Sequence, residues 1–375
     1  MAGIYIHVPF CSRRCIYCDF FSQTEMRYKS DFVQAIVGEL SLRRTYLGGE
    51  AIETIYFGGG TPSLLQAADF ERIFNAIRTH HNVLPDAEIT LEANPDDLND
   101  AYVSALQPLP FNRISLGVQS FRDDDLQLLN RRHNCHQVMN AVSLCREYGY
   151  ENLSIDLIYG LPGQTPERWK ENLEMALRLD VPHLSAYHLS CEENTPLYRQ
   201  LQHGVVRPVD ERVSVRFFHT LIYMLAAAGY LHYEISNFCK PGCFSRHNSS
   251  CWTGGKYLGV GPSAHSFDHV SRQWNIASLP EYLRGITCGT PVFEKETLDL
   301  QTRYNEYVMT RLRTMWGIRL SALRETFGMD FAAYFLRQVQ PHIRHGLIRQ
   351  TDETFGLTPQ GAFVSDGILS DLMSI

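Results

Sequence analysis

The feature that most constrains the fold is a regular alternation of short apolar, β-branched runs with longer amphipathic segments over the first 230 residues. The runs predict six strands, at 4–8, 54–57, 88–92, 113–118, 154–159 and 183–188. The amphipathic segments predict helices at about 28–46, 64–80, 97–107, 122–148, 166–179 and 210–228. Strict alternation implies parallel strands joined by right-handed crossovers. Six such units fall short of the eight of a closed barrel, so we predict an α/β fold, a partial (β/α)6 barrel of TIM type, over residues 1–230.

The rest of the chain divides into two parts. Residues 231–296 lose the alternation and are rich in Gly, Asn, Ser and His, so they predict an irregular connecting region. From 297 to 375 the pattern predicts helices at about 303–315, 321–327 and 331–345, a β-ribbon around Asp352-Glu353 and a last helix after Thr358. This arrangement is typical of a smaller, mostly helical, winged-helix-like domain. It holds eight Arg, no Lys and eight Asp plus Glu, so it lacks the basic face of a DNA-reading module, and we expect it to pack on or cover the barrel.

Charge and hydropathy exclude several classes of function. The chain has 34 Lys plus Arg against 41 Asp plus Glu, a net charge of −7, which argues against a nucleic-acid partner. No uninterrupted apolar run approaches the length of a transmembrane segment. The first residues carry neither a basic region nor a small-residue cleavage site. We therefore expect a cytoplasmic protein without a transmembrane segment.

Three cysteines form a compact group directly after the first predicted strand. Cys11, Cys15 and Cys18 make a C-x3-C-x2-C pattern, while the other seven cysteines are spread over positions 135–288. Zinc sites usually use four ligands in paired clips, and no second clip follows. Three thiolates suit three irons of a 4Fe–4S cubane, whose fourth iron then stays open for the amino and carboxylate groups of S-adenosylmethionine. The pattern therefore predicts a 4Fe–4S cluster with an S-adenosylmethionine site.

Longer motifs also support a 4Fe–4S cluster with an S-adenosylmethionine site. They are Ile4-Tyr5-Ile6-His7-Val8-Pro9-Phe10-Cys11, Gly58-Gly59-Gly60-Thr61-Pro62-Ser63, Glu92-Ala93-Asn94-Pro95, Gly117-Val118-Gln119-Ser120, and Ser154-Ile155-Asp156 continuing to Leu161-Pro162-Gly163-Gln164-Thr165. In these blocks, from residue 4 to about 290, the chain resembles the radical S-adenosylmethionine superfamily and, within it, the oxygen-independent coproporphyrinogen III oxidase family. The resemblance implies that the cysteine triplet ligates the cluster.

Further site residues follow from the resemblance and from their places at strand ends. The implied contacts to S-adenosylmethionine are Tyr5, Gly59, Gly60, Thr61, Glu92, Gln119, Arg131 and Asp156. The catalytic edge of a (β/α) barrel lies where its strands end. Arginine can neutralise the cofactor carboxylate, and carboxylates can hold ribose hydroxyls. Without the family resemblance, each of these charged residues is more often a solvated strand-end charge.

Two departures separate this chain from the dehydrogenases of the family. Those enzymes carry a further cysteine two residues after the third ligand, where this chain has Phe20, and a longer N-terminal extension, where it has ten residues before Cys11. Both features resemble the haem chaperone (HemW) branch. Ser245-Arg246-His247-Asn248-Ser249-Ser250-Cys251-Trp252 resembles that branch's H-N-x-x-Y-W motif, with Cys251 in place of tyrosine. The resemblance implies His247 as a haem ligand, with a Cys251 thiolate as the other candidate.

The function implied is therefore haem binding and delivery. The partners would be haem, haem-accepting proteins of respiration that include membrane-associated ones, and an electron donor for the cluster. The alternative is an oxygen-independent coproporphyrinogen III dehydrogenase, which decarboxylates its substrate oxidatively to protoporphyrinogen IX. A radical transferase or methylase acting on another tetrapyrrole is a third reading. All three share the cluster, so the sequence leaves open whether the protein is an enzyme.

Overall fold

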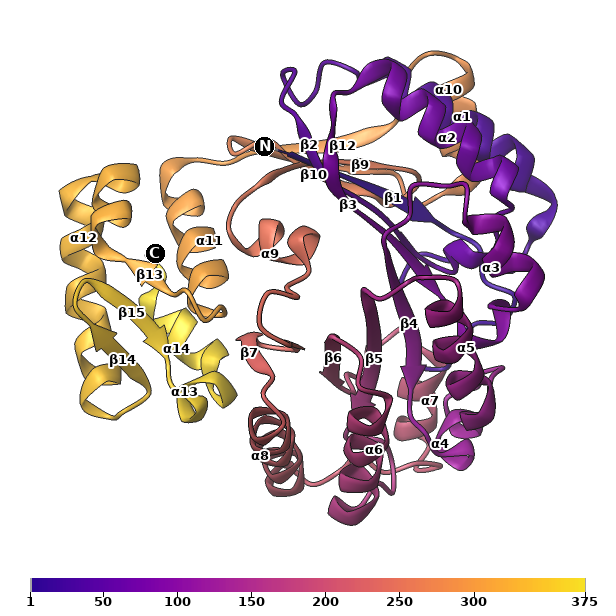
Figure 1. The fold of residues 1–375 in the computed structure, drawn as a ribbon. Helices are drawn as coiled ribbons and strands as arrows, with labels where there is room; N and C mark the ends of the chain where they lie inside the picture. The colour runs from indigo at the N-terminus through magenta and orange to yellow at the C-terminus, as the bar shows by residue number, and fades with distance from the viewer. Residues whose placement is uncertain (1, 375) are drawn as a thin grey trace.

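A curved sheet with helices on its outer face dominates the fold. The computed structural model describes residues 2–374, and in this part of the chain a 12-stranded sheet has the order β12-β11-β10-β9-β1-β2-β3-β4-β5-β6-β8-β7. Its centre consists of six parallel strands, β1 (Ala2–Val8), β2 (Ile52–Gly59), β3 (Val83–Ala93), β4 (Arg113–Gln119), β5 (Leu153–Tyr159) and β6 (His183–His188). The sheet curves without closing, and the helices that alternate with its parallel strands lie outside the curve (Figure 1). The predicted partial barrel is confirmed.

The helices that follow these strands begin and end close to their predicted positions, except for one over residues 196–202 that was not predicted. They are α1 (Lys29–Leu42), α2 (Ala67–His80), α3 (Asp100–Leu106), α4 (Asp123–Leu128), α5 (Cys135–Glu147), α6 (Pro166–Leu179), α7 (Pro196–Gln202) and α8 (Glu211–Ala227). The single helix predicted over 122–148 is wrong, because the structure has α4 and α5 there. Asn130 takes a left-handed φ of 61° between them, and Asn134 caps α5 by accepting a hydrogen bond from the Gln137 backbone N–H.

The segment predicted to be irregular, 231–296, contains regular structure and extends the sheet at both edges. It holds β7 (Leu231–Glu234), β8 (Asn237–Cys239), α9 (Arg246–Trp252), β9 (Lys256–Val260), β10 (His265–Phe267), β11 (Ser271–Asn275), α10 (Leu279–Thr287) and nearly all of β12 (Phe293–Thr297). β8 pairs antiparallel with β6, whereas β9 pairs parallel with β1. Strands of three to five residues with mixed polarity give no clear periodicity, so the sequence pattern missed them.

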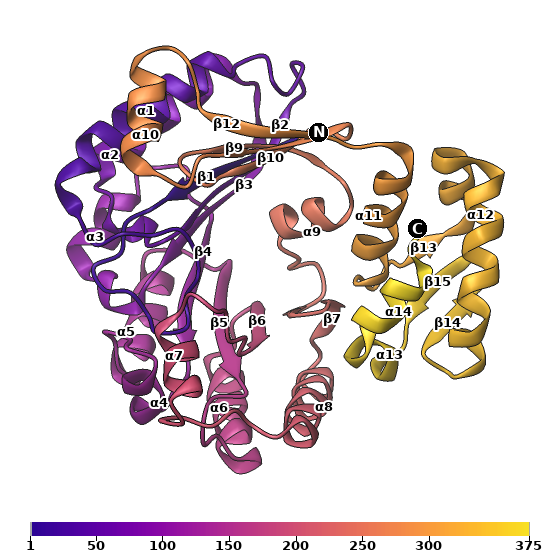
Figure 2. The ribbon, with the colours of Figure 1, turned by 180° about the vertical axis from the view of Figure 1, so that it is seen from behind.

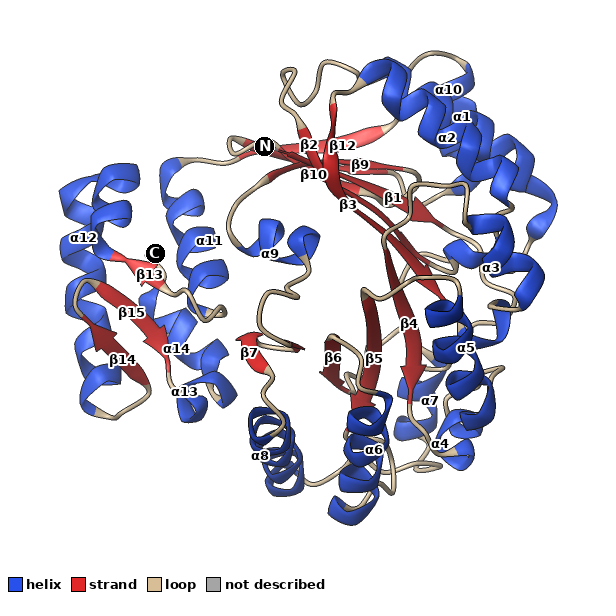
Figure 3. Cartoon of the chain, in the orientation of Figure 1, coloured by secondary structure: helices blue, strands red, loops and turns tan. Residues whose placement is uncertain are grey.

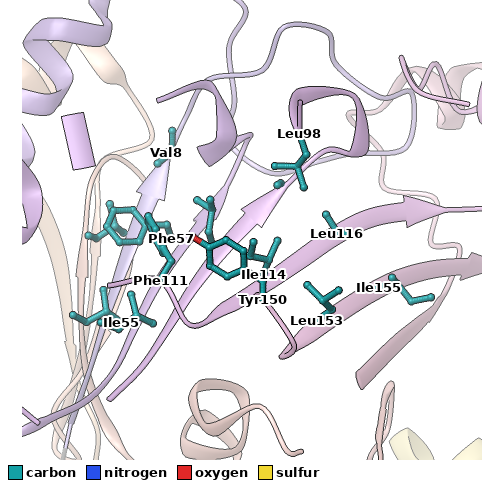
Figure 4. Close-up of a cluster of buried hydrophobic side chains, with 14 of the residues drawn as sticks. Val8, Ile55, Phe57, Leu98, Phe111, Ile114, Leu116, Tyr150, Leu153 and Ile155 are labelled. Atoms are coloured by element: carbon teal, nitrogen blue, oxygen red, sulfur yellow. The ribbon is translucent and has the colours of Figure 1, made fainter. Parts of the chain in front are cut away.

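The apolar core lies between the sheet and its helices rather than inside the curve. Phe57 of β2 packs edge-on against Phe70, Phe74 and Phe111 at ring centroid distances of 5.2–5.5 Å, and the apolar residues of β4 and β5 lie in the same layer (Figure 4). Side chains alternate between the two faces of a strand. The opposite face of β4 therefore presents Arg113 and Ser115 to the inside of the curve, which is polar. Closed barrels of this type instead fill their interior with branched apolar side chains.

Residues after β12 form a smaller unit with a separate hydrophobic cluster. Its elements are α11 (Leu300–Leu312), β13 (Ile318–Arg319), α12 (Leu320–Arg344), β14 (Ile348–Thr351), β15 (Thr354–Leu357), α13 (Pro359–Phe363) and α14 (Ser365–Leu372). Gly328 has a non-helical φ of 87° and so divides α12 into two helical parts. These parts correspond to the two helices predicted at about 321–327 and 331–345. The three strands form a sheet of order β13-β15-β14 among helices (Figure 3). The mostly helical C-terminal region is thus confirmed, and none of the helices described here is long and apolar enough to cross a membrane.

Candidate functional site

The cysteine triplet lines a cavity at the carboxyl edge of the central strands. The loop that carries it leaves β1 at Val8 and is fixed by a hydrogen bond from the Cys11 backbone N–H to the Gln23 carbonyl, at 2.9 Å. All three cysteines border a cavity of about 440 Å³. The strand-end residues predicted for the site border the same cavity; they are Gly59, Gly60, Thr61, Glu92, Gln119, Arg131 and Asp156. The fold therefore brings together residues that lie up to 145 positions apart in the chain.

The arrangement of the thiols suits a cluster better than a single ion. Over residues 2–374, no group of three His, Cys, Asp or Glu side chains is placed to hold one metal ion. A cubane offers each thiolate its own iron, so thiols that share a cavity without meeting at one point fit it. Burial raises the pKa of Cys11, and it raises the pKa of Cys18 to about 11, so both are neutral thiols at pH 7.

A hydrogen-bonded arc joins two of these cysteines across the strand ends. Arg131 Nη1 donates to Cys15 Sγ at 3.4 Å, and Arg131 Nη2 donates to Asn94 Oδ1 at 2.7 Å. Asn94 Nδ2 donates to Thr61 Oγ1 at 3.4 Å, and the Thr61 hydroxyl donates to Cys11 Sγ at 3.5 Å. Hydrogen bonds to the sulfurs are one of the means by which proteins set the potential of an iron–sulfur cluster.

The glycine motif after β2 is required by close packing. A Cβ on Gly59 would lie 2.6 Å from the His7 ring, and the φ of Gly59 is 102°. A Cβ on Gly60 would lie 2.7 Å from the Phe10 carbonyl oxygen and 3.1 Å from Cys11 Sγ. Only glycine fits at these two positions, because both contacts are to parts of the chain that cannot move without displacing the cysteine loop.

Two buried carboxyl groups lie on the inner wall of the cavity. Burial raises the pKa of Glu92 to about 7, with the charge of Asp156 adding to the shift and the Tyr56 hydroxyl, which donates to Glu92 Oε1 at 2.7 Å, opposing it. Burial also raises the pKa of Asp156 to about 6, against a hydrogen bond from Ser185. Both groups therefore change charge near neutral pH, which is a common property of functional carboxyls.

Gln119 ends β4 in a conformation that is rare for a residue with a side chain. Its φ is 66°, and the register of β4 with β5 shifts between Leu116 and Gln119. A bulge of this kind turns a side chain away from the direction that the regular strand would give it. Gln119 thereby faces the cavity.

Two of the predicted residues lie beneath the cavity and do not border it. The Tyr5 hydroxyl donates to His7 Nδ1 at 3.2 Å, because His7 Nε2 donates to the Phe21 carbonyl at 2.8 Å. His247, on α9, is 7% exposed and its Nδ1 is hydrogen-bonded to Thr54 Oγ1 at 2.8 Å. Burial lowers the pKa of His247 to about 4, so its imidazole is neutral.

Sequence reasoning missed two residues of the site. Asn94 stands inside a quoted motif but received no role, and the structure makes it the centre of the arc between the cysteines. Tyr56 received no role either, and it holds Glu92. The alternation of side chains along β2 could have identified Tyr56. It lies two residues before Gly58, on the inward face of the strand, where a polar hydroxyl needs a partner.

Comparisons with known proteins agree with the motifs. Residues 5–176 match the Radical SAM superfamily, and residues 298–364 match the HemN C-terminal domain. A protein of Mycobacterium tuberculosis named "Heme chaperone HemW" is 32% identical over 378 residues, with 99% of this chain and 94% of the relative covered. The Bacillus subtilis protein of the same name is 31% identical, with 98% of both chains covered. In Escherichia coli, the protein of that name is 37% identical over 70% of this chain and 69% of its own length.

Among solved structures, the coproporphyrinogen III oxidase (HemN) of Escherichia coli superposes on the whole chain. Its TM-score is 0.87 at 24% identity, with 100% of this chain and 90% of the oxidase covered. At that identity the likeness concerns the fold, whereas the relatives above 30% identity identify the branch. These matches confirm the resemblance given by the motifs. The chain belongs to the radical S-adenosylmethionine superfamily and, within it, to the HemW family.

Proposed function

We propose that this protein binds haem and passes it to acceptor haem proteins, and that it holds a 4Fe–4S cluster and S-adenosylmethionine. The observation that carries the proposal is the similarity to "Heme chaperone HemW" relatives along almost the entire chain, including the C-terminal unit. The acceptors proposed are respiratory haem proteins, and the cluster requires an electron donor. The proposed compartment is the cytoplasm, since a cluster needs reduced cysteines and all ten are free thiols within residues 2–374.

Cys11, Cys15 and Cys18 are the proposed cluster ligands. A bound cluster with S-adenosylmethionine supplies one-electron chemistry at the cofactor's sulfonium. The surrounding residues keep the loop in place: Thr61 and Arg131 donate to two of the sulfurs. Arg131 Nε is buried and has no hydrogen-bond partner among residues 2–374, so one donor of the guanidinium is free at the place proposed for the cofactor carboxylate.

The other proposed cofactor contacts divide between backbone and side chains. Gly59 and Gly60 offer backbone groups that no Cβ shields, Thr61 offers its backbone beside them, and Gln119 offers an amide. Glu92 and Asp156 would accept hydrogen bonds from ribose hydroxyls in their charged forms. Tyr5 would act from the layer beneath. Together these groups would hold the cofactor across the strand ends and keep water away from it.

Phe20 supports delivery over decarboxylation. It borders the cysteine cavity and is 63% exposed, at the position where the dehydrogenases of the wider family carry a further cysteine. A phenyl ring can neither ligate iron nor transfer a proton. An exposed aromatic ring at the mouth of a cavity is suited instead to contact with a flat apolar ligand or with a partner protein.

The test is an anaerobic assay with reconstituted protein. One sample receives S-adenosylmethionine, a reductant and coproporphyrinogen III, and a second is titrated with haem and then mixed with an apo-haem protein. We expect no protoporphyrinogen, together with saturable stoichiometric haem binding and transfer of the haem to the apo-protein. Multiple turnovers of coproporphyrinogen III would refute the proposal in favour of the dehydrogenase. The Cys15→Ala variant, which cannot complete the triplet, shows in the same titration whether haem binding requires the cluster.

A further inference from the structure

Helix α9 is inserted into the open side of the curved sheet. It lies inside the curve between β7 and the edge formed by β1, β2 and β9 in both views (Figures 1 and 2). Its first backbone N–H groups are held by one buried carboxylate, since Arg246 N donates to Glu88 Oε2 and His247 N donates to Glu88 Oε1, both at 2.9 Å. Ser245 caps the helix by accepting from Asn248 N. The position of α9 is therefore set by a strand of the central sheet.

The His247 side chain fits closely among the inward-facing residues of β1 and β2. Its ring stacks on Tyr56 at a centroid distance of 5.0 Å and on Tyr5 at 6.4 Å, each with an interplanar angle of 27°. A Cβ on Gly3 would lie 2.8 Å from Thr54 Oγ1, the hydrogen-bond partner of the imidazole, so β1 carries glycine beside this pair. The hydrogen bond from Thr54 fixes the rotation of the ring. Nε2 makes no hydrogen bond to any residue that the structure describes.

The stacked Tyr56 connects this ring to the cofactor cavity. Its hydroxyl donates to Glu92 Oε1, and Glu92 borders the cavity. A tyrosine side chain that faces a polar interior can rotate about two side-chain torsions unless neighbouring rings confine it. Tyr5 lies on one side of Tyr56, at a centroid distance of 6.1 Å, and His247 confines it from α9. The orientation of the Glu92 carboxylate thus depends on a residue that enters from a distant part of the chain.

We propose that His247 is a positioning residue of the S-adenosylmethionine site, which confines Tyr56 and through it holds Glu92 toward the cofactor. The inference rests on the proposed function, because it takes Glu92 as a cofactor contact. It gives His247 a role different from haem ligation. A haem iron would have to reach Nε2 of a side chain that is 7% exposed and stacked on Tyr56.

The test measures S-adenosylmethionine affinity of anaerobically reconstituted protein by equilibrium dialysis. The variants are His247→Ala, Tyr56→Phe and the double variant, with His219→Ala as a control, since it removes an exposed histidine of α8. Removing a residue that orients a ligating group typically costs about tenfold in affinity, and we expect this loss for each single variant. The double variant should bind no more weakly than the weaker single variant, because both changes act through the same contact with Glu92. His219→Ala should bind as the wild type does.

Haemin titration of the same variants separates positioning from ligation. We expect His247→Ala to keep the wild-type haemin affinity. Loss of haemin binding with unchanged S-adenosylmethionine affinity would overturn the proposal, and so would additive losses in the double variant. Wild-type protein that binds no S-adenosylmethionine would overturn both this proposal and the cofactor site.

If His247→Ala does not fold, Thr54→Val takes its place, since it removes the hydrogen bond to Nδ1 without changing the shape of the side chain. Its expected loss of S-adenosylmethionine affinity is about threefold, and wild-type affinity in this variant would count against the proposal.

Discussion

The affinity for S-adenosylmethionine should rise with pH because two buried carboxyl groups must be charged to hold it. The pKa of Glu92 is raised to about 7, mainly by burial, and that of Asp156 to about 6 for the same reason. Besides each other, the charged or titratable groups that act on Glu92 are Tyr56 and Arg113, which both lower its pKa. Since both carboxyls have raised pKa values, their charged forms are lost as the pH falls through 7 and then 6.

The expected size of the effect follows from the charged fractions. With a pKa of about 7, the charged fraction of Glu92 is about 9% at pH 6 and about 91% at pH 8, a change of about tenfold. With a pKa of about 6, Asp156 contributes a further change of about twofold. The affinity should therefore increase about twentyfold from pH 6 to pH 8 if the cofactor binds only the charged forms.

Equilibrium dialysis of the reconstituted protein between pH 6 and pH 8 measures this dependence. The amino group of the cofactor titrates in the same range, so the informative quantity is the difference between the wild type and Glu92→Gln. In this variant the tenfold contribution should disappear. A pH dependence that is the same in both proteins would refute the role of Glu92. Tyr56→Phe should move the midpoint to higher pH, because it removes a hydrogen bond that lowers the pKa of Glu92.

Three further predictions concern the cluster loop and the polar interior. Cys15→Ala should abolish the broad brown absorbance of the reconstituted protein, and an unchanged spectrum would rule out the three-ligand assignment. Gly60→Ala should destabilise the fold by about 1–3 kcal/mol and reduce iron content, because its Cβ would meet the Phe10 carbonyl at 2.7 Å; thermal unfolding and iron analysis measure both. Arg113→Met should shift the pH midpoint of cofactor binding upward, since the guanidinium lowers the pKa of Glu92, and an unmoved midpoint would contradict this.

Matched controls exist for each of these changes. Cys145→Ala removes a buried thiol outside the triplet and should leave the absorbance as it is. Gly367→Ala adds a Cβ within α14 where no atom lies within 4 Å, so it should raise stability by about 1 kcal/mol. Arg113→Lys keeps the positive charge and should hold the midpoint near its wild-type value.

The sequence predicted those parts of the protein that depend on residues near one another in the chain. The six central strands alternate with helices in a pattern that local periodicity reveals, and the structure places β6 at the predicted residues 183–188. The spacing of Cys11, Cys15 and Cys18 follows from the needs of one loop. Strand ends could be located because parallel strands joined by helices all end at one edge. These features together predicted the barrel, the cysteine loop and ten of the residues that line the cavity.

Tertiary structure alone decided what the distant segments do. The parallel pairing of β9 with β1 joins residues about 250 positions apart, and no local pattern encodes such a partner. It is this return of the chain that brings α9 inside the sheet and buries His247 against Tyr56. The role of Asn94 is of the same kind, because its contacts come from Thr61 after β2 and from Arg131 between α4 and α5. Periodicity records which face of an element is buried, whereas the partner that buries it is set by long-range packing.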